Sequence, residues 1–188
     1  MTDGTGGTRA RIQAVALELF TEQGYEKTSL REIAERLGVT KAALYYHFKS
    51  KDDIVSSLVE DRVGRLDNLI EWAQDQPATA ANRREVLRRY AHEFFASHRP
   101  SVMRFFEQNQ TVLKSLAAGQ MMRDRLLHMA DVLAGPGSSP SAQLRATLSL
   151  FAVHGSWFAV RTPQISDEER MRMALDIAYE LLDRIDEE

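Results

Sequence analysis

Hydrophobic residues recur along the chain at the spacing of helices. The first clear run, which places its members on one helix face, is Ile12, Val15, Ala16, Leu19 and Phe20. A second, shorter run is Leu30, Ile33, Ala34 and Leu37. No segment shows the sustained alternation of hydrophobic and polar residues, flanked by hairpin turns, that is typical of strands. The pattern therefore predicts an all-α chain of about nine helices.

Start and stop signals divide these helices from one another. Gly24 and Gly38 interrupt the first part of the chain, and proline-containing breaks follow at residues 76–77, 98–100, 135–140 and 162–163. Residues suited to cap a helix N-terminus follow several of these breaks. The candidate caps are Ser29 with Glu32 (or Thr28 instead), Thr40, Ser50 with Asp53, and Ser166 with Glu169.

Residues 9–52 show the pattern of a helix-turn-helix unit. They contain three short predicted helices, and Gly38 provides a turn between the second and the third. In the third helix, Leu44 and Phe48 lie one turn apart and are expected to face the core of this unit. The residues left for its outer surface are Lys41, Ala42, Tyr45, Tyr46 and His47.

That outer surface has the chemistry of a nucleic-acid contact. The tyrosine hydroxyls and the imidazole suit phosphate oxygens, and residues 39–51 contain three lysines and no acidic residue. Small Ala42 and Ala43 would let the helix backbone approach a major groove closely. The alternative is a solvated helix face with ordinary surface lysines. Because the whole chain carries a net charge of −3, any such site must be a local patch.

Residues 9–52 closely resemble the DNA-binding domain of the TetR family of transcriptional regulators. The matching segments are Ala14–Phe20, Gly24–Tyr25, Thr28–Ala34, Leu37–Val39 and Leu44–Lys51. They reproduce nearly the whole family signature in order and spacing, over about a quarter of the chain. Many members carry glycine where this chain has Ala42, which is a mild departure that bears on base preference.

The resemblance implies a homodimer whose helix-turn-helix heads bind a near-palindromic operator in successive major grooves. Family members are usually repressors that a small molecule releases from DNA. We therefore expect a flexible N-terminus over residues 1–8, a DNA-binding domain over residues 9–52, and an effector-binding and dimerisation domain over residues 53–188. The expected DNA-binding residues are Thr28, Arg31, Thr40, Lys41, Ala42, Ala43, Tyr45, Tyr46, His47, Lys49 and Lys51.

Two helices near the C-terminus are candidates for a dimer interface. From Leu148 onward, residues 144–160 are apolar on nearly all sides, and such a helix needs two buried faces. One face can pack within the subunit and the other against a partner, although both could also be buried in one subunit. With the last helix, the expected interface residues are Leu148, Phe151, Ala152, Gly155, Ala159, Ile177, Leu181 and Ile185.

Aromatic and methionine side chains are the candidates for an effector pocket. The candidate residues are Phe94, Phe95, Phe105, Phe106, Gln108, Met121, Met122, Trp157 and Phe158. Apolar walls with a few polar groups are typical of small-molecule sites, and methionine adapts to varied ligands. The alternative for each residue is ordinary core packing, because Phe and Met at helical spacing are usually buried.

Several function classes are not expected. The chain has no cysteine, which excludes disulfides, thiolate metal sites and a cysteine nucleophile. Its histidines lack the paired spacing of helical zinc motifs, and no phosphate-binding or nucleophile motif is present, so we expect neither a metal, a cofactor nor an enzyme. No apolar run reaches the roughly 18–20 residues that span a bilayer, and we expect a cytoplasmic protein. The alternatives are an activator, an effector-independent regulator, and a helical small-molecule-binding protein or enzyme without DNA binding.

Overall fold

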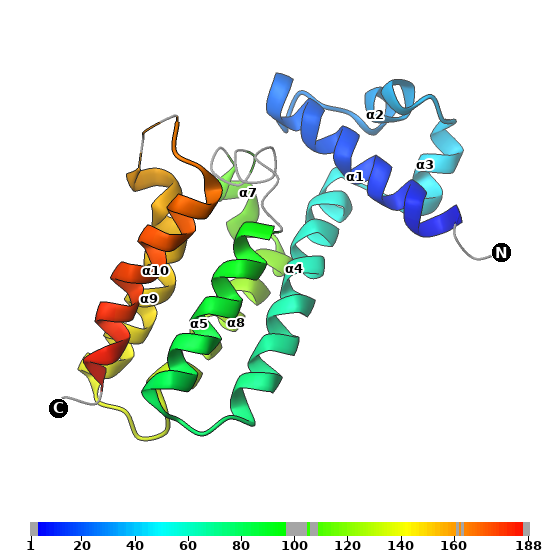
Figure 1. Ribbon diagram of the computed structural model, residues 1–188. Helices are drawn as coiled ribbons and strands as arrows, with labels where there is room; N and C mark the ends of the chain where they lie inside the picture. Colours follow the sequence, from blue (N-terminus) through cyan, green and yellow to red (C-terminus); the bar gives the residue numbers. More distant parts are fainter. Residues whose placement is uncertain (1–3, 97–104, 106–108, 161, 163, 186–188) are drawn as a thin grey trace. The chain divides into compact units, whose positions relative to one another are not determined.

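The computed structural model describes residues 4–96, 105, 109–160, 162 and 164–185, which form helices and no strand (Figure 1). The helices are α1 (Gly4–Gln23), α2 (Leu30–Leu37), α3 (Lys41–His47), α4 (Lys51–Gln74), α5 (Ala80–Ala96), α7 (Gln110–Ser115), α8 (Ala117–Ala134), α9 (Pro140–Ala159) and α10 (Asp167–Asp183). The predicted all-α fold is confirmed. Helix α1 begins at Gly4, within the segment that we expected to be flexible.

The chain divides into two compact units. Unit 1 comprises residues 1–62 and 98–122, and unit 2 comprises residues 63–97 and 123–188. The expected boundary after residue 52 differs from this division in two respects. Unit 1 includes the first half of α4, and it also includes α7 from the middle of the chain, because α7 packs against the core of the first three helices.

The helix starts follow the predicted caps. Ser29 accepts a hydrogen bond from the backbone N–H of Glu32, whose carboxylate accepts one from the Ser29 N–H, so the capping box is complete. These bonds to Ser29 lower the pKa of Glu32. Thr40 caps α3 through the N–H of Ala43 at 3.1 Å. The Ser50–Asp53 and Ser166–Glu169 caps form as well.

Unit 1 has one hydrophobic core. It gathers the apolar faces of α1, α2 and α3 with the start of α4, and its most deeply buried large side chains include Ile12, Phe20, Ile33 and Leu44. Gly38 ends α2 in the left-handed region at φ 71°, which glycine adopts without strain, and its N–H caps the carbonyls of the last turn. The tight turn between α2 and α3 therefore fixes the orientation of α3.

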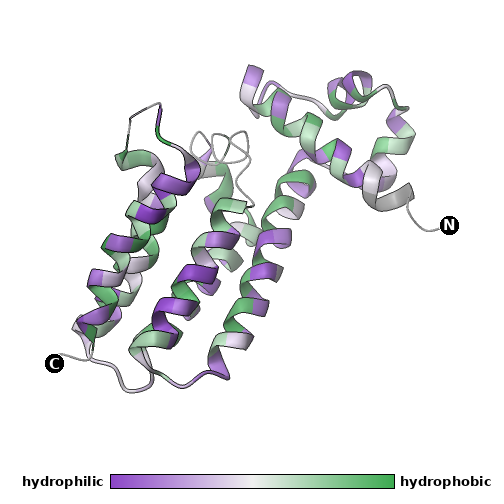
Figure 2. Cartoon of the chain, viewed as in Figure 1, coloured by the Kyte–Doolittle hydropathy of each residue, from purple (hydrophilic) through white to green (hydrophobic). Residues whose placement is uncertain are grey.

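Unit 2 is a helical bundle in which α10 packs against α9 and α5. Its helices alternate hydrophobic and polar residues, as Figure 2 shows, and the hydrophobic side chains buried between them include Leu87, Leu133, Val153 and Leu182. A buried arginine, Arg170 of α10, donates hydrogen bonds to carbonyls at the end of α9. The N-terminus of α10 is thereby tied to the C-terminus of α9.

Candidate nucleic-acid interface

Helix α3 separates a buried face from an exposed one. Leu44 is fully buried and Phe48, which caps the helix, is nearly so, whereas Tyr46 has 75 % of its surface exposed. Lys41, Ala42 and Ala43 are exposed on the same helix. An exposed tyrosine beside small residues and a lysine leaves a hydroxyl, a cation and a closely accessible backbone on one surface. That combination suits a phosphate backbone and the edges of bases in a groove.

The other candidates on α3 hold this surface in place. The Lys41 ammonium lies 5.4 Å from the centre of the half-buried Tyr45 ring. Lys49 donates to the Tyr45 carbonyl at 2.7 Å, at the C-terminal end of the helix where a cation is favourable. The His47 ring packs edge-on against Tyr46, with centroids 5.3 Å apart. The aromatic side chains are thus ordered by their neighbours and by the lysines.

Two of the expected phosphate contacts make hydrogen bonds within unit 1. Thr28 is buried, and its hydroxyl donates to the Gly24 carbonyl at 2.8 Å. Lys51 donates to the Tyr25 carbonyl at 2.6 Å, and its ammonium lies 4.5 Å from the centre of the Tyr25 ring. Arg31 is exposed and pairs with Glu35 at 2.7 Å, and this hydrogen bond raises the pKa of Arg31. Of these three residues, Arg31 is exposed, Lys51 is partly exposed and Thr28 is buried.

The sequence did not predict the contacts that Tyr25 makes in unit 1. Its hydroxyl donates to the Asp52 carboxylate, and burial together with this bond raises its pKa. The Phe20 ring lies edge-on to the Tyr25 ring, 5.0 Å away. Gly24–Tyr25 belongs to the family-like motif, but a motif alone does not give partners that are distant in the sequence.

Three of the expected effector residues do come together. In unit 2, Phe94 and Phe95 of α5 lie edge-on, with ring centroids 5.5 Å apart, and Phe95 lies 6.0 Å from Trp157 of α9. The ring of His154 stacks on Phe94 at 4.6 Å, and its Nε2 is hydrogen-bonded to the Tyr90 hydroxyl. These rings therefore contact one another between α5 and α9.

The remaining effector candidates lie elsewhere. Phe105, which we expected to line a pocket, is fully buried in the core of unit 1. Met121 and Met122 also belong to unit 1, and Phe158 is exposed on α9. Phe106 and Gln108 lie outside the described residues. The sequence pattern could not distinguish core residues from pocket residues, because the same residue types occur in both.

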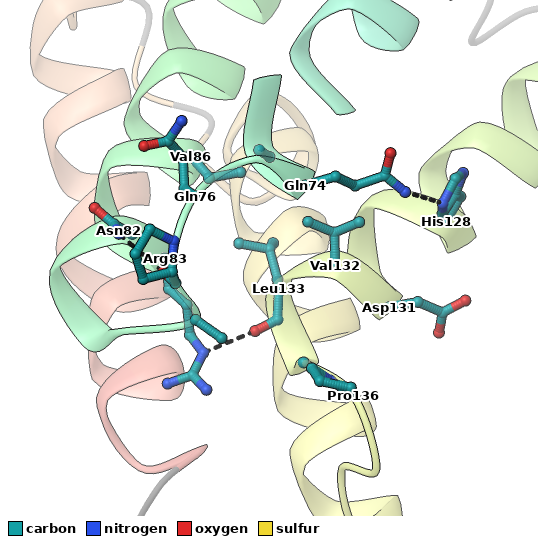
Figure 3. Close-up of a pocket in the computed structure, with 14 residues that line it drawn as sticks. Gln74, Gln76, Asn82, Arg83, Val86, His128, Asp131, Val132, Leu133 and Pro136 are labelled. Carbon is teal, nitrogen blue, oxygen red and sulfur yellow. Dashed lines mark hydrogen bonds between the residues drawn. The ribbon is translucent and has the colours of Figure 1, made fainter. Parts of the chain in front are cut away.

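Two concavities of unit 2 are lined by other residues. Figure 3 shows a pocket of about 290 Å³ between the ends of α4, α5 and α8. At this pocket, Gln74 lies 3.1 Å from His128, nitrogen to nitrogen, and Arg83 donates to the Leu133 carbonyl at 2.9 Å. A second, more polar hollow of about 480 Å³ lies between α4 and α5, where the Arg89 guanidinium stacks 3.7 Å from the centre of the Trp72 ring.

The expected dimer face is largely exposed. Phe151 of α9 and Ile177 of α10 have 58 % and 57 % of their surfaces exposed. Leu148, Ala159 and part of Ala152, Gly155 and Leu181 are exposed as well. Ile185 is the exception, since it is buried within its own unit. An apolar surface on two neighbouring helices is typical of a protein interface.

The described residues contain no group of three or more His, Asp or Glu side chains arranged to hold a metal ion. Within the same residues, no helix is both long and apolar enough to cross a membrane.

Comparisons with known proteins identify the N-terminal domain. Residues 12–58 match the family described as bacterial regulatory proteins, tetR family. The chain is 49 % identical over 63 residues to the HTH-type transcriptional regulator AcrR of Shigella flexneri, covering 32 % of this chain and 29 % of AcrR. It is 30 % identical over 115 residues to the HTH-type transcriptional activator FasR of Mycolicibacterium smegmatis, covering 60 % of this chain and 51 % of FasR. The match thus spans less than a third of one relative and about half of the other.

The fold agrees over most of the chain. The structure of the TetR family transcriptional regulator PfmR from Thermus thermophilus superposes with a TM-score of 0.63 at 26 % identity, covering 93 % of this chain and 96 % of PfmR. The N-terminal match and the shared all-α fold lead to the same result. Residues 12–58 match the tetR family, and the fold of the chain is similar to that of a TetR family regulator.

Proposed function

We propose that this protein is a sequence-specific transcriptional repressor that binds a near-palindromic operator as a homodimer, in the cytoplasm, and is released by a small-molecule effector. The observation that carries the DNA-binding part is the exposure of Tyr46 on α3, opposite a fully buried Leu44. A largely exposed tyrosine contributes little to the core, and its hydroxyl is placed to meet a phosphate.

Its DNA-binding surface would be α3, with Lys41, Ala42, Ala43, Tyr46 and His47 at the groove. Arg31 of α2 and Lys49, which follows α3, would add positive charge around this surface, because both side chains are exposed. Interactions of this kind release counterions from the phosphate backbone, so operator affinity should fall steeply as salt rises.

The proposed dimer would use the apolar surface of α9 and α10. A two-fold interface brings the same patch of both copies together, so a single exposed face is sufficient. Phe151 and Ile177 would form its centre, where burial of large apolar side chains contributes most to affinity.

The proposed effector would be small. The pocket in Figure 3, at about 290 Å³, is at the lower end of the usual size of ligand sites. Its walls combine apolar Val86, Val132 and Leu133 with polar Gln74 and His128, which suits an amphipathic molecule. Such a ligand would release DNA only through a difference in its affinity for the DNA-bound and the free conformation.

A second candidate function is transcriptional activation. One relative, FasR, is named an activator, and its match extends beyond the DNA-binding domain. Both candidates share the operator-binding step and differ in the position of the operator relative to the promoter.

A random-oligonucleotide selection with the full-length protein at near-physiological salt tests the proposal. We expect enrichment of a near-palindromic motif, and its sequence then provides the operator for release assays. If a folded protein enriches no motif, sequence-specific DNA binding by this chain alone is refuted.

A further inference from the structure

A residue from the middle of the chain completes the core of the DNA-binding unit. Phe105 is fully buried, and its ring lies 5.3 Å from that of Phe20 and 5.9 Å from that of Tyr25. The three rings form one cluster, since Phe20 and Tyr25 also contact each other. Aromatic clusters of this kind stabilise by contact geometry as well as by burial.

Helix α7 adds further side chains to the same core. Val112, Leu113 and Leu116 are partly buried against the cluster that contains Phe105 and the apolar faces of α1–α3. The core of the DNA-binding unit therefore includes side chains far outside the family-like segment at residues 12–58.

The Phe105 ring packs near Tyr25, which binds the start of α4 just after α3, the helix proposed to read DNA (the recognition helix). Tyr25 binds both residues that begin α4: its hydroxyl donates to Asp52, and its carbonyl accepts from Lys51 at 2.6 Å. Helix α4 begins only three residues after the cap of α3 at Phe48. Tyr25 thus connects Phe105 with the start of α4, close to the C-terminal end of α3.

Gly119 holds α7 in this place. A Cβ atom at Gly119 would lie 2.0 Å from the carbonyl oxygen of Leu113, a distance at which the backbone must move. The Gly119 N–H donates to the Leu116 carbonyl at 3.0 Å, which closes the corner between α7 and α8. Leu113 and Leu116, which pack on the core, are thus the residues that this corner positions.

We propose that Phe105 is a positioning residue for the recognition helix, and that α7 acts with it as part of the DNA-binding unit, held by the close approach of Gly119 to Leu113. The expected effect of Phe105 on operator binding rests on the proposed function. The expected effect of Phe105 on the order of α3 does not depend on that function.

Hydrogen–deuterium exchange of the full-length protein tests the placement without DNA. The three atoms nearest to a Cβ at Gly119 all belong to Leu113 of α7. We nevertheless expect Gly119→Ala to raise amide exchange in α2 and α3 about 5-fold or more, while α9 and α10 keep their parental rates. Gly64→Ala is the matched control, because a Cβ there meets nothing within 4 Å. If the folded Gly119→Ala protein exchanges the amide hydrogens of α2 and α3 at the same rates as the parent, the proposal is overturned. If this variant does not fold, Phe105→Leu decides by the same readout.

Operator affinity then separates positioning from general stability. Phe105→Leu is compared with Leu87→Ala, a buried substitution in α5 of unit 2, by anisotropy on the operator recovered by selection. We expect Phe105→Leu to weaken binding about tenfold or more and Leu87→Ala to leave it nearly unchanged when both remain folded at the assay temperature. Equal losses, or none from Phe105→Leu, would overturn the positioning role. If no operator is enriched, the proposed function fails, and the exchange experiment still decides this inference.

Discussion

The substitution Phe151→Asp tests whether the apolar surface of α9 holds two copies of the chain together. Phe151 is 58 % exposed within one copy, so the charge can be accommodated in the folded monomer. Full burial of a large apolar side chain contributes about 1.5–3 kcal/mol, and the exposed share of Phe151 gives about 1–2 kcal/mol. A two-fold interface contains the substitution twice, so the loss is about 2–4 kcal/mol, or roughly 30- to 700-fold in the dimer dissociation constant.

Sedimentation analysis over a dilution series measures this constant directly. Leu127→Asp is the matched control, since Leu127 of α8 is 53 % exposed but does not belong to the α9–α10 face. We expect the control to remain dimeric and Phe151→Asp to dissociate at micromolar concentration with an unchanged helical spectrum. If both variants dissociate alike, or neither does, the assignment of the interface to α9 and α10 is refuted.

Three further substitutions and one titration test other parts of the structure. Leu44→Ala removes a fully buried side chain and should reduce the free energy of unfolding by about 2–5 kcal/mol in denaturant titrations. Gly38→Ala places a Cβ at φ 71° and should cost about 1 kcal/mol, seen as a lower melting temperature, whereas a gain in stability would contradict the left-handed conformation of this turn. Arg170→Met removes two buried charge-assisted hydrogen bonds and should cost about 2–4 kcal/mol, with local exchange rising at the end of α9. The Glu85 carboxyl, bound by two arginines, has its pKa lowered to about 2. Because the folded pKa lies below the unfolded one, its stabilisation is present above the ordinary glutamate pKa and is lost as the pH falls towards 2, and an NMR titration with a midpoint near the ordinary value would contradict the pairing.

The first three helices could be predicted from the sequence because their determinants are local. The Ser29–Glu32 capping box and the Thr40 cap act within three residues, and the four-residue spacing of Leu44 and Phe48 gives the buried face of α3 directly. The same locality makes the exposure of Tyr46 predictable.

Contacts between distant segments could not be predicted in this way. Nothing in the spacing around Phe105 distinguishes a side chain that fills the core beside Phe20 from one that lines a pocket. Likewise, the pattern of α9 and α10 predicted the exposed Phe151 and Ile177, but not that Ile185 would be buried in its own unit. Helical periodicity gives the face on which a residue lies and not the partner that it meets.

The most direct test of the account is the affinity of Tyr46→Ala for the selected operator, measured beside the parent by fluorescence anisotropy. Because this side chain is 75 % exposed, we expect an unchanged melting temperature. The loss of a hydrogen bond to a charged phosphate, about 1.5–3 kcal/mol, predicts binding weaker by roughly 10- to 150-fold. Parental affinity in the folded variant would contradict the assignment of the outer face of α3 as the DNA-reading surface.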